Sequence, residues 1–297
     1  MKATTANPDR TLGNWLLNLF ARGLLAMLLA LPYRWRVPFS GWLMAHVVAP
    51  VAGYRARMRR NLKLVLPDLP EAEVTKIIRE VPDNAGRTFV EIYSGREFVS
   101  RLGGQLPTGP GMEALRAAKA KGQPVLLASG HIGNYDAFRG TLAVNGFEVG
   151  ALYRTARNPW INSHYIAAMS RIGTPLFERG RPGLTAMVRY LRKGGTVAIL
   201  IDQHVASGAK LNFFGRPAMT TLSLAEMALK YDALVIPIYA LRRPDGLSFD
   251  IITEAPIPHA APDVMMQALN DSLERQVRAH MGQWLWAHRR WKVAPNA

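Results

Sequence analysis

The sequence predicts an α/β protein with a mostly parallel central sheet flanked by helices, preceded by a hydrophobic membrane-anchoring helix at the N-terminus. Three observations support this prediction. Strand-like and helix-like segments alternate from residue 54 onward, several of the strand-like segments are apolar throughout, and one long apolar run lies within the first 31 residues. Alternating strands and helices are typical of a parallel sheet, whose strands are apolar along their length when both faces are covered.

The composition limits the class of protein before any motif is considered. The 297 residues are 49% hydrophobic, enough to build one large or two ordinary domains, and they carry a formal net charge of +16. The absence of cysteine excludes disulfides, thiolate zinc sites and a cysteine nucleophile. The basic excess indicates an anionic partner, which could be nucleic acid, an acidic protein or a lipid surface.

Residues 1–53 are predicted to anchor the protein to a membrane. Their apolar run, Leu16 to Leu31, is bracketed by tryptophan and tyrosine, as at membrane interfaces. In a helix the polar residues of this region would share one stripe: Thr11, Asn14, Asn18 and Arg22. An arginine within the run favours an in-plane or shallow anchor over a spanning helix. A buried core helix and a cleaved signal peptide are the alternatives.

Positive charge is concentrated beside this anchor. Residues 1–63 contain ten basic side chains and a single acid. The run from Tyr54 to Lys63 therefore predicts a juxtamembrane patch facing anionic headgroups, with a solvated helix face as the alternative.

The remainder, residues 54–297, is predicted to form one domain. Helices are expected first over about 54–65, 70–81 and 84–99, the second opening with a proline and acids that suit a helix N-terminus. Strands are expected over 124–129, 147–153, 196–201, 233–239 and 247–253. Helical patterns near 111–121, 134–144, 160–172, 183–193, 221–231 and 263–281 alternate with them.

The clearest candidate for a catalytic site is the turn after the first predicted strand, Ser129-Gly-His-Ile-Gly-Asn-Tyr-Asp136. On one continuous helix Asp136 would point about 140° away from His131. Gly130 and Gly133 can supply a turn that brings the two side chains together. A histidine oriented by a carboxylate is a general base, and a substrate with its own hydroxyl would need no protein nucleophile. The alternative is a surface histidine followed by a first-turn helix charge.

This turn resembles a family signature. His131-x4-Asp136 after a hydrophobic strand is similar to the motif of the glycerolipid-type acyltransferases, and the string from Gly130 to Asp136 resembles their lipid A late-acyltransferase branch, the lauroyl and myristoyl transferases of Gram-negative bacteria. Further blocks that resemble this family follow in order over nearly the whole chain: Tyr153-Arg154 with Asn158-Pro159; Arg171, Gly173, Arg179 and Gly180; Leu200 to Gln203 with Phe213 to Thr220; and Gln283 to Lys292. His204 and the stretch from His280 to Gln283 depart from the usual pattern, which bears on acyl chain and acceptor more than on the reaction.

The resemblance implies an α/β acyltransferase fold and transfer of a fatty acyl chain from acyl-carrier protein to a hydroxyl of a lipid A precursor, at the cytoplasmic face of the cell inner membrane. His131 would accept the hydroxyl proton and Asp136 would orient it.

The other expected site residues surround this pair. Arg154 and backbone N–H groups near Asn134 would stabilise the oxyanion, although Arg154 could instead contact phosphate or glycan or form an ion pair. Asp202, at the end of an apolar strand, is expected to bind substrate or to cap a helix. The remaining candidates are Gln203 and Arg179 for substrate binding, and Phe213 and Phe214 for an acyl pocket or ordinary core.

No metal and no cofactor beyond the acyl-carrier-protein co-substrate is expected. The seven histidines lack zinc-site spacing, and no phosphate-binding glycine motif is present.

The expected partners are acyl-carrier protein, anionic membrane lipid and the lipid A precursor. The stretch from Trp284 to Lys292 interleaves tryptophan with basic residues, which could stack on single-stranded nucleic acid or pack beside a membrane. The second reading is favoured, so no nucleic acid is expected. Alternative functions are an acyltransferase for a lysophospholipid or a phosphatidylinositol mannoside, or a basic membrane-binding or nucleic-acid-binding protein.

Overall fold

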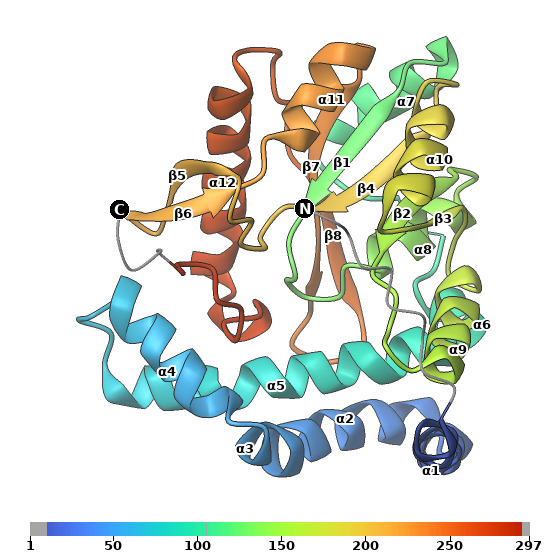
Figure 1. Cartoon of the computed structure of the whole chain (residues 1–297), viewed down its shortest axis with the longest axis vertical. Helices are drawn as coiled ribbons and strands as arrows, with labels where there is room; N and C mark the ends of the chain where they lie inside the picture. The colour runs from blue at the N-terminus through green and yellow to red at the C-terminus, as the bar shows by residue number, and fades with distance from the viewer. Residues whose placement is uncertain (1–10, 105, 293–297) are drawn as a thin grey trace.

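A six-stranded sheet forms the centre of the computed structural model, which describes residues 11–104 and 106–292 (Figure 1). The strand order is β3-β2-β4-β1-β7-β8. Five strands are parallel, and β8 runs antiparallel to β7 at one edge. The strands are β1 (Val125–Ser129), β2 (Val149–Tyr153), β3 (Leu176–Glu178), β4 (Thr196–Leu200), β7 (Leu234–Arg242) and β8 (Phe249–Thr253). The predicted α/β fold with a mostly parallel sheet is confirmed.

Helices cover both faces of the sheet because alternate side chains of each strand point to opposite faces. Leu126 of β1 belongs to a core built with α10 (Arg181–Leu191), α11 (Ser223–Tyr231), α12 (Pro262–Ala279) and the C-terminal tryptophans. Its neighbour Leu127 belongs to a second core, built with α7 (Gly111–Lys121), α8 (Ala137–Val144) and α9 (Pro159–Ser170). The apolar character of β1 follows from burial on both sides.

A layer of helices from the first third of the chain lies across one end of the sheet, at the bottom of Figure 1. It comprises α1 (Leu12–Ala30), α2 (Tyr33–Leu43), the π-helix η1 (Met44–Val48), α3 (Ala49–Val51), α4 (Tyr54–Val65), α5 (Glu71–Ser94) and α6 (Arg96–Arg101). Helices α2 and α5 pack so closely that a Cβ on Gly86 would lie 2.4 Å from the carbonyl oxygen of Ser40. The predicted division after residue 53 falls at Gly53, between α3 and α4, and stays a prediction.

Helix α1 turns its polar stripe to the protein and its apolar side chains outward. Asn18 is buried, and the side-chain amide of Asn158 in front of α9 donates to the carbonyl of Asn14 at 2.7 Å. Leu12 and Phe20 are each more than 70% exposed. Among the described residues α1 alone is long and apolar enough to cross a membrane. Its exposure excludes the alternative of a buried core helix, whereas residues 1–10 of the predicted anchor lie outside the described chain.

Several boundaries differ from the expectations. Instead of ending near residue 81, α5 continues through Pro82 to Ser94, because packing of its buried face against α2 outweighs the hydrogen bond that proline removes. The helix expected from residue 134 begins at Ala137 because the preceding residues form a turn. The sequence analysis missed β3 and the hairpin of β5 (Ala209–Phe213) and β6 (Arg216–Thr220).

Candidate active site

His131 and Asp202 meet at the carboxyl edge of the sheet because β1 and β4 are adjacent and parallel. Ser129 at the end of β1 pairs in register with Leu200 at the end of β4. His131 and Asp202 each lie two residues further along, so the register places them opposite each other. The Nδ1 atom of His131 is 2.7 Å from Oδ1 of Asp202. This edge is where open α/β sheets place their ligands.

The Asp202 carboxylate is completely buried and accepts three hydrogen bonds. Besides His131 Nδ1–H, the backbone N–H of His131 donates to Oδ2 at 2.7 Å and Trp284 Nε1–H donates to the same oxygen at 2.9 Å. Burial by itself would raise the pKa of Asp202, but the charge of His131 and its hydrogen bonds hold that pKa well below the usual range. Asp202 is therefore ionised and fixed in orientation.

Asp202 also determines which nitrogen of His131 carries a proton. Since Nδ1 donates to the carboxylate, Nε2 has the free lone pair, and it has no hydrogen-bond partner in the part of the chain that the structure describes. Burial would lower the pKa of His131, but the negative charge of Asp202 and the hydrogen bond to it raise the pKa overall. The side chain is 17% exposed, so a substrate can reach the ring. These are the properties of a general base.

The expected contact between His131 and Asp136 is not formed, and that prediction was wrong. Asp136 is buried and forms an ion pair with Arg139, three residues along the chain, while its backbone N–H donates to Asn134 at 3.0 Å. The turn instead passes tightly over β7: Gly133 has φ +57°, and a Cβ there would lie 1.9 Å from the carbonyl oxygen of Ala240. The glycine shapes the turn but leads Asp136 away from the histidine.

A buried polar network fixes this turn from below. Asn84 of α5 donates to the carbonyl of Gly133 at 2.9 Å, and Asn134 donates to Glu91 at 2.8 Å. Glu91 is paired in turn with Arg242, both side chains being buried. The network rigidifies the segment that carries His131.

The predicted backbone oxyanion donors are already occupied. The N–H of Gly133 donates to the carbonyl of Gln283 at 3.1 Å, and that of Asn134 donates to Ala240 at 3.0 Å. The Asn134 side chain is held by Glu91 and Asp136. Asn134 therefore supports the turn instead of facing a substrate.

Two aromatic rings pack edge-on against His131. The ring centroid of Tyr135 lies 5.3 Å from that of His131, and the centroid of His288 lies 4.8 Å away on the C-terminal segment. Burial lowers the pKa of His288 to about 4, despite the opposing charge of Asp202, so this ring is neutral at physiological pH. Sequence reasoning quoted His288 and Trp284 within the closing motif but did not assign either to the site.

His131, Asp202 and His288 also have the residue types of a metal site. Their ligand atoms all lie within 4.8 Å of one another. Both carboxylate oxygens of Asp202 already accept hydrogen bonds, from His131 and Trp284, and a metal ion would have to displace them. That no metal takes part stays a prediction.

A cavity of about 220 Å³ opens beside His131 and is lined mainly by apolar side chains. It lies between η1, α5, the catalytic turn and the C-terminal segment. The lining residues are Met44, Val81, Asn84, Ala85, Thr88, Phe89, Ile92, His131, Gly133, Tyr135, Tyr165, Gln283 and Leu285.

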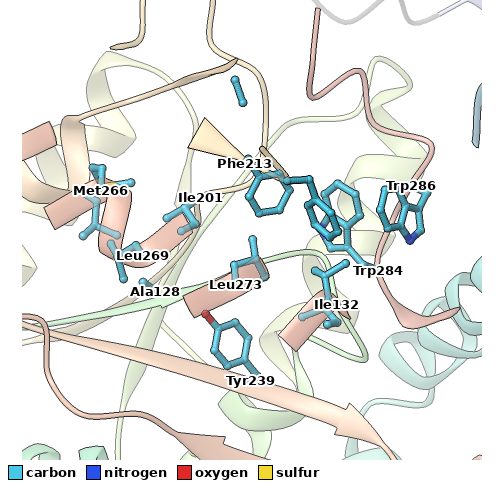
Figure 2. Packing of buried hydrophobic residues seen from close by; sticks show 14 of the residues in the cluster. Ala128, Ile132, Ile201, Phe213, Tyr239, Met266, Leu269, Leu273, Trp284 and Trp286 are labelled. Carbon is cyan, nitrogen blue, oxygen red and sulfur yellow. The ribbon is translucent and has the colours of Figure 1, made fainter. Parts of the chain in front are cut away.

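Phe213 and Phe214 are not in this cavity, which corrects the predicted acyl pocket. Both are at least 97% buried in the core that Figure 2 shows, where Phe213 lies edge-on to Trp284 with ring centroids 5.6 Å apart. Phe214 contacts Trp286 in the same way at 5.3 Å. Their role is to pack the C-terminal tryptophans that hold Asp202.

Three other predicted site residues are exposed and do not line the cavity: Arg154, Arg179 and Gln203. Arg154 follows β2, and the backbone of Arg179 donates to the carbonyl of Tyr153 at 2.7 Å. Their roles in substrate binding stay predictions.

Comparison with known proteins matches residues 6–293 to the family model described as bacterial lipid A biosynthesis acyltransferase. A lipid A biosynthesis acyltransferase of Haemophilus influenzae is 24% identical over 86% of this chain and 83% of its own length. A lipid A biosynthesis lauroyltransferase of Escherichia coli is 23% identical over 80% and 79%, respectively. A phosphatidylinositol mannoside acyltransferase of Mycobacterium tuberculosis is 22% identical over 79% and 76%.

Proposed function

The chain belongs to the bacterial lipid A biosynthesis acyltransferase family, an assignment that makes it a lipid acyltransferase. From this premise we propose that it transfers a fatty acyl chain from acyl-carrier protein to a hydroxyl of a lipid A precursor. The observation that carries the proposal is the pair of His131 and Asp202, with the open ring nitrogen beside an apolar cavity.

The reaction begins with the acceptor hydroxyl. His131 Nε2 takes its proton as the oxygen attacks the thioester carbonyl, and the ionised Asp202 stabilises the imidazolium that results. Collapse of the tetrahedral intermediate breaks the carbon–sulfur bond, and the imidazolium returns the proton to the departing thiolate. The products are an ester and the free thiol of the carrier, and no cofactor is consumed. In this scheme Asp202 takes the orienting role that the sequence assigned to Asp136.

The cavity beside His131 holds the first part of the acyl chain. Its walls combine Val81 and Ile92 of α5 with Leu285 of the C-terminal segment and Met44 of η1. Apolar walls around one histidine suit a hydrocarbon chain whose reactive carbonyl must stop at the base.

The enzyme works at the cytoplasmic face of the inner membrane, held there by α1. The helix exposes its apolar side over most of its length and keeps its polar stripe against the protein. This arrangement suits a helix that contacts lipid on one side and protein on the other.

Purified full-length protein, incubated with acyl-carrier-protein thioesters and a lipid A precursor that bears a free hydroxyacyl chain, tests the proposal by mass spectrometry. One added acyl chain is expected, with no product from His131→Ala. His259→Ala, whose ring contacts the carbonyl of Ala233 outside the cavity, is the matched control and should retain activity. Wild-type turnover by His131→Ala in folded protein would refute the mechanism, and turnover only with a coenzyme A thioester would refute the donor.

A second acceptor is supported by the similarity to the phosphatidylinositol mannoside acyltransferase. The same assay with a phosphatidylinositol mannoside in place of the lipid A precursor distinguishes the two. Acylation of the mannoside alone would replace the proposed acceptor but leave the chemistry of His131 and Asp202 in place.

A further inference from the structure

A second cavity, of about 430 Å³, lies between α4 and the first half of α5. Small or uncharged side chains form part of its lining, among them Ala56, Ala72 and Thr75. Four cationic side chains surround it: Arg55 and Arg59 of α4, and Lys76 and Arg79 of α5. We call this cavity the cationic groove. None of the four residues has a part in the chemistry proposed above.

The positive charge of the cationic groove is only partly compensated. Arg59 pairs with Glu71, and Lys76 lies 3.4 Å from Glu73. All four of these side chains are at least 40% exposed, so such pairs contribute about 0–1 kcal/mol and can be exchanged for a ligand.

The other two cations contact no carboxylate within the described chain. Arg55 donates to the carbonyl of Ala45 at 2.7 Å, which fixes its guanidinium against η1, and Arg79 has no acidic partner within 4.0 Å. Four cations against two acids leave a charge of +2 in one concave site. A phosphate group matches this site because guanidinium groups bind its oxygens in pairs.

An apolar tip stands directly before the groove in the chain. It consists of Val47, Val48, Val51 and Tyr54, and Val51 is 88% exposed. Arg55, the first cation of the groove, follows this tip immediately. A soluble partner gives no reason to expose valine at this place, whereas a membrane offers acyl chains to the tip and phosphates at the adjacent level.

We propose that the cationic groove binds the phosphate of an anionic membrane lipid while the apolar tip inserts among the acyl chains. The groove orients the protein on the membrane through a specific site, in addition to the general attraction of its net charge. Lipid binding can be measured without turnover, so its failure would leave the proposed chemistry untouched.

The test compares binding of the full chain to vesicles of phosphatidylcholine with and without phosphatidylglycerol, measured by flotation. Lys76→Gln/Arg79→Gln is the groove variant, since both residues are exposed and glutamine suits a helix. Arg189→Gln/Lys193→Gln, at the end of α10, removes the same charges from another exposed surface. The groove variant should bind phosphatidylglycerol vesicles about 30-fold more weakly than wild type, at about 1 kcal/mol for each cation, and the control less than about threefold.

A second vesicle separates a phosphate site from diffuse attraction. Oleate carries a carboxylate and no phosphate, and vesicles containing it can be matched to the same surface charge. The deficit of the groove variant should largely disappear on oleate vesicles. Equal losses for groove and control variants, or equal deficits on both vesicles, would overturn the proposal. So would unchanged vesicle binding with a raised KM for the acyl-carrier protein, which would assign the groove to an acidic protein.

Discussion

Replacing Asp202 by asparagine tests the central geometry of the site. Asp202 accepts two N–H donors at Oδ2, from Trp284 and the His131 backbone, and one at Oδ1, from the His131 ring. The amide oxygen of asparagine will keep the position with two donors, which leaves its NH2 group 2.7 Å from Nδ1. That nitrogen must then become the acceptor, and the proton moves to Nε2, where the base needs a lone pair.

The size of the effect follows from the bonds that change. Keeping the active tautomer in Asp202→Asn forfeits one charge-assisted hydrogen bond, worth about 1.5–3 kcal/mol. It also places two donors face to face, at a further cost of about 1–3 kcal/mol. Together these give about 3–6 kcal/mol, or a loss of about 10²–10⁴-fold in kcat.

The pH profile gives a second readout of the same variant. His131 acts as a base only when unprotonated, so wild-type kcat/KM falls as the pH drops through a pKa that Asp202 has raised above the ordinary value of about 6.5. Without that charge, burial lowers the pKa of His131, and the acid limb of the residual activity should move to lower pH.

The assay is acyl transfer from acyl-carrier-protein thioester between pH 5 and 9, with Asp271→Asn on exposed α12 as the isosteric control. An Asp202→Asn enzyme with turnover within threefold of wild type and an unmoved acid limb would refute the reasoning.

Three further outcomes are expected. Asp136→Asn leaves Arg139 buried without its partner and should lower the free energy of unfolding by about 3–5 kcal/mol in denaturant titrations while the acid limb of any remaining activity stays in place; an unchanged midpoint would contradict the ion pair. Phe213→Ala should cost about 3–5 kcal/mol of stability without changing acyl-chain preference, whereas Ala85→Phe should shift preference to shorter chains by filling the cavity; the reverse pattern in a chain-length series would restore Phe213 to the acyl pocket. Dialysis against a chelator should leave turnover unchanged, and a loss that zinc restores would assign a metal to His131, Asp202 and His288.

The fold was largely predictable because its signals are local. The unbroken apolar run of β1, with Leu126 and Leu127 facing opposite cores, already indicates a strand covered on both faces. Local signals failed where tertiary packing decided the outcome. Pro82 predicts a helix end, but packing of α5 against α2 carries the helix through it.

The site was predictable only in part, because its geometry depends on which strands are neighbours. His131 could be singled out from its turn, and Asp202 from the end of an apolar strand. Their contact requires that β4 lie beside β1, although β2 and β3 separate them in sequence. Spacing along the chain favoured Asp136 for the same reason: the nearest carboxylate in sequence is visible, and strand order is not.

The predicted anchor and the predicted enzyme domain share one functional wall. Met44 lies in the segment expected to serve only as an anchor, yet it lines the cavity beside His131 together with Val81 of α5. The π-helix that carries Met44 also carries Ala45, whose carbonyl binds Arg55 of the cationic groove. A membrane contact at this helix would therefore act on both cavities at once, because one backbone segment forms part of the wall of the first and fixes a side chain of the second. For that reason truncation before residue 54 is expected to remove the acyl cavity as well as the anchor.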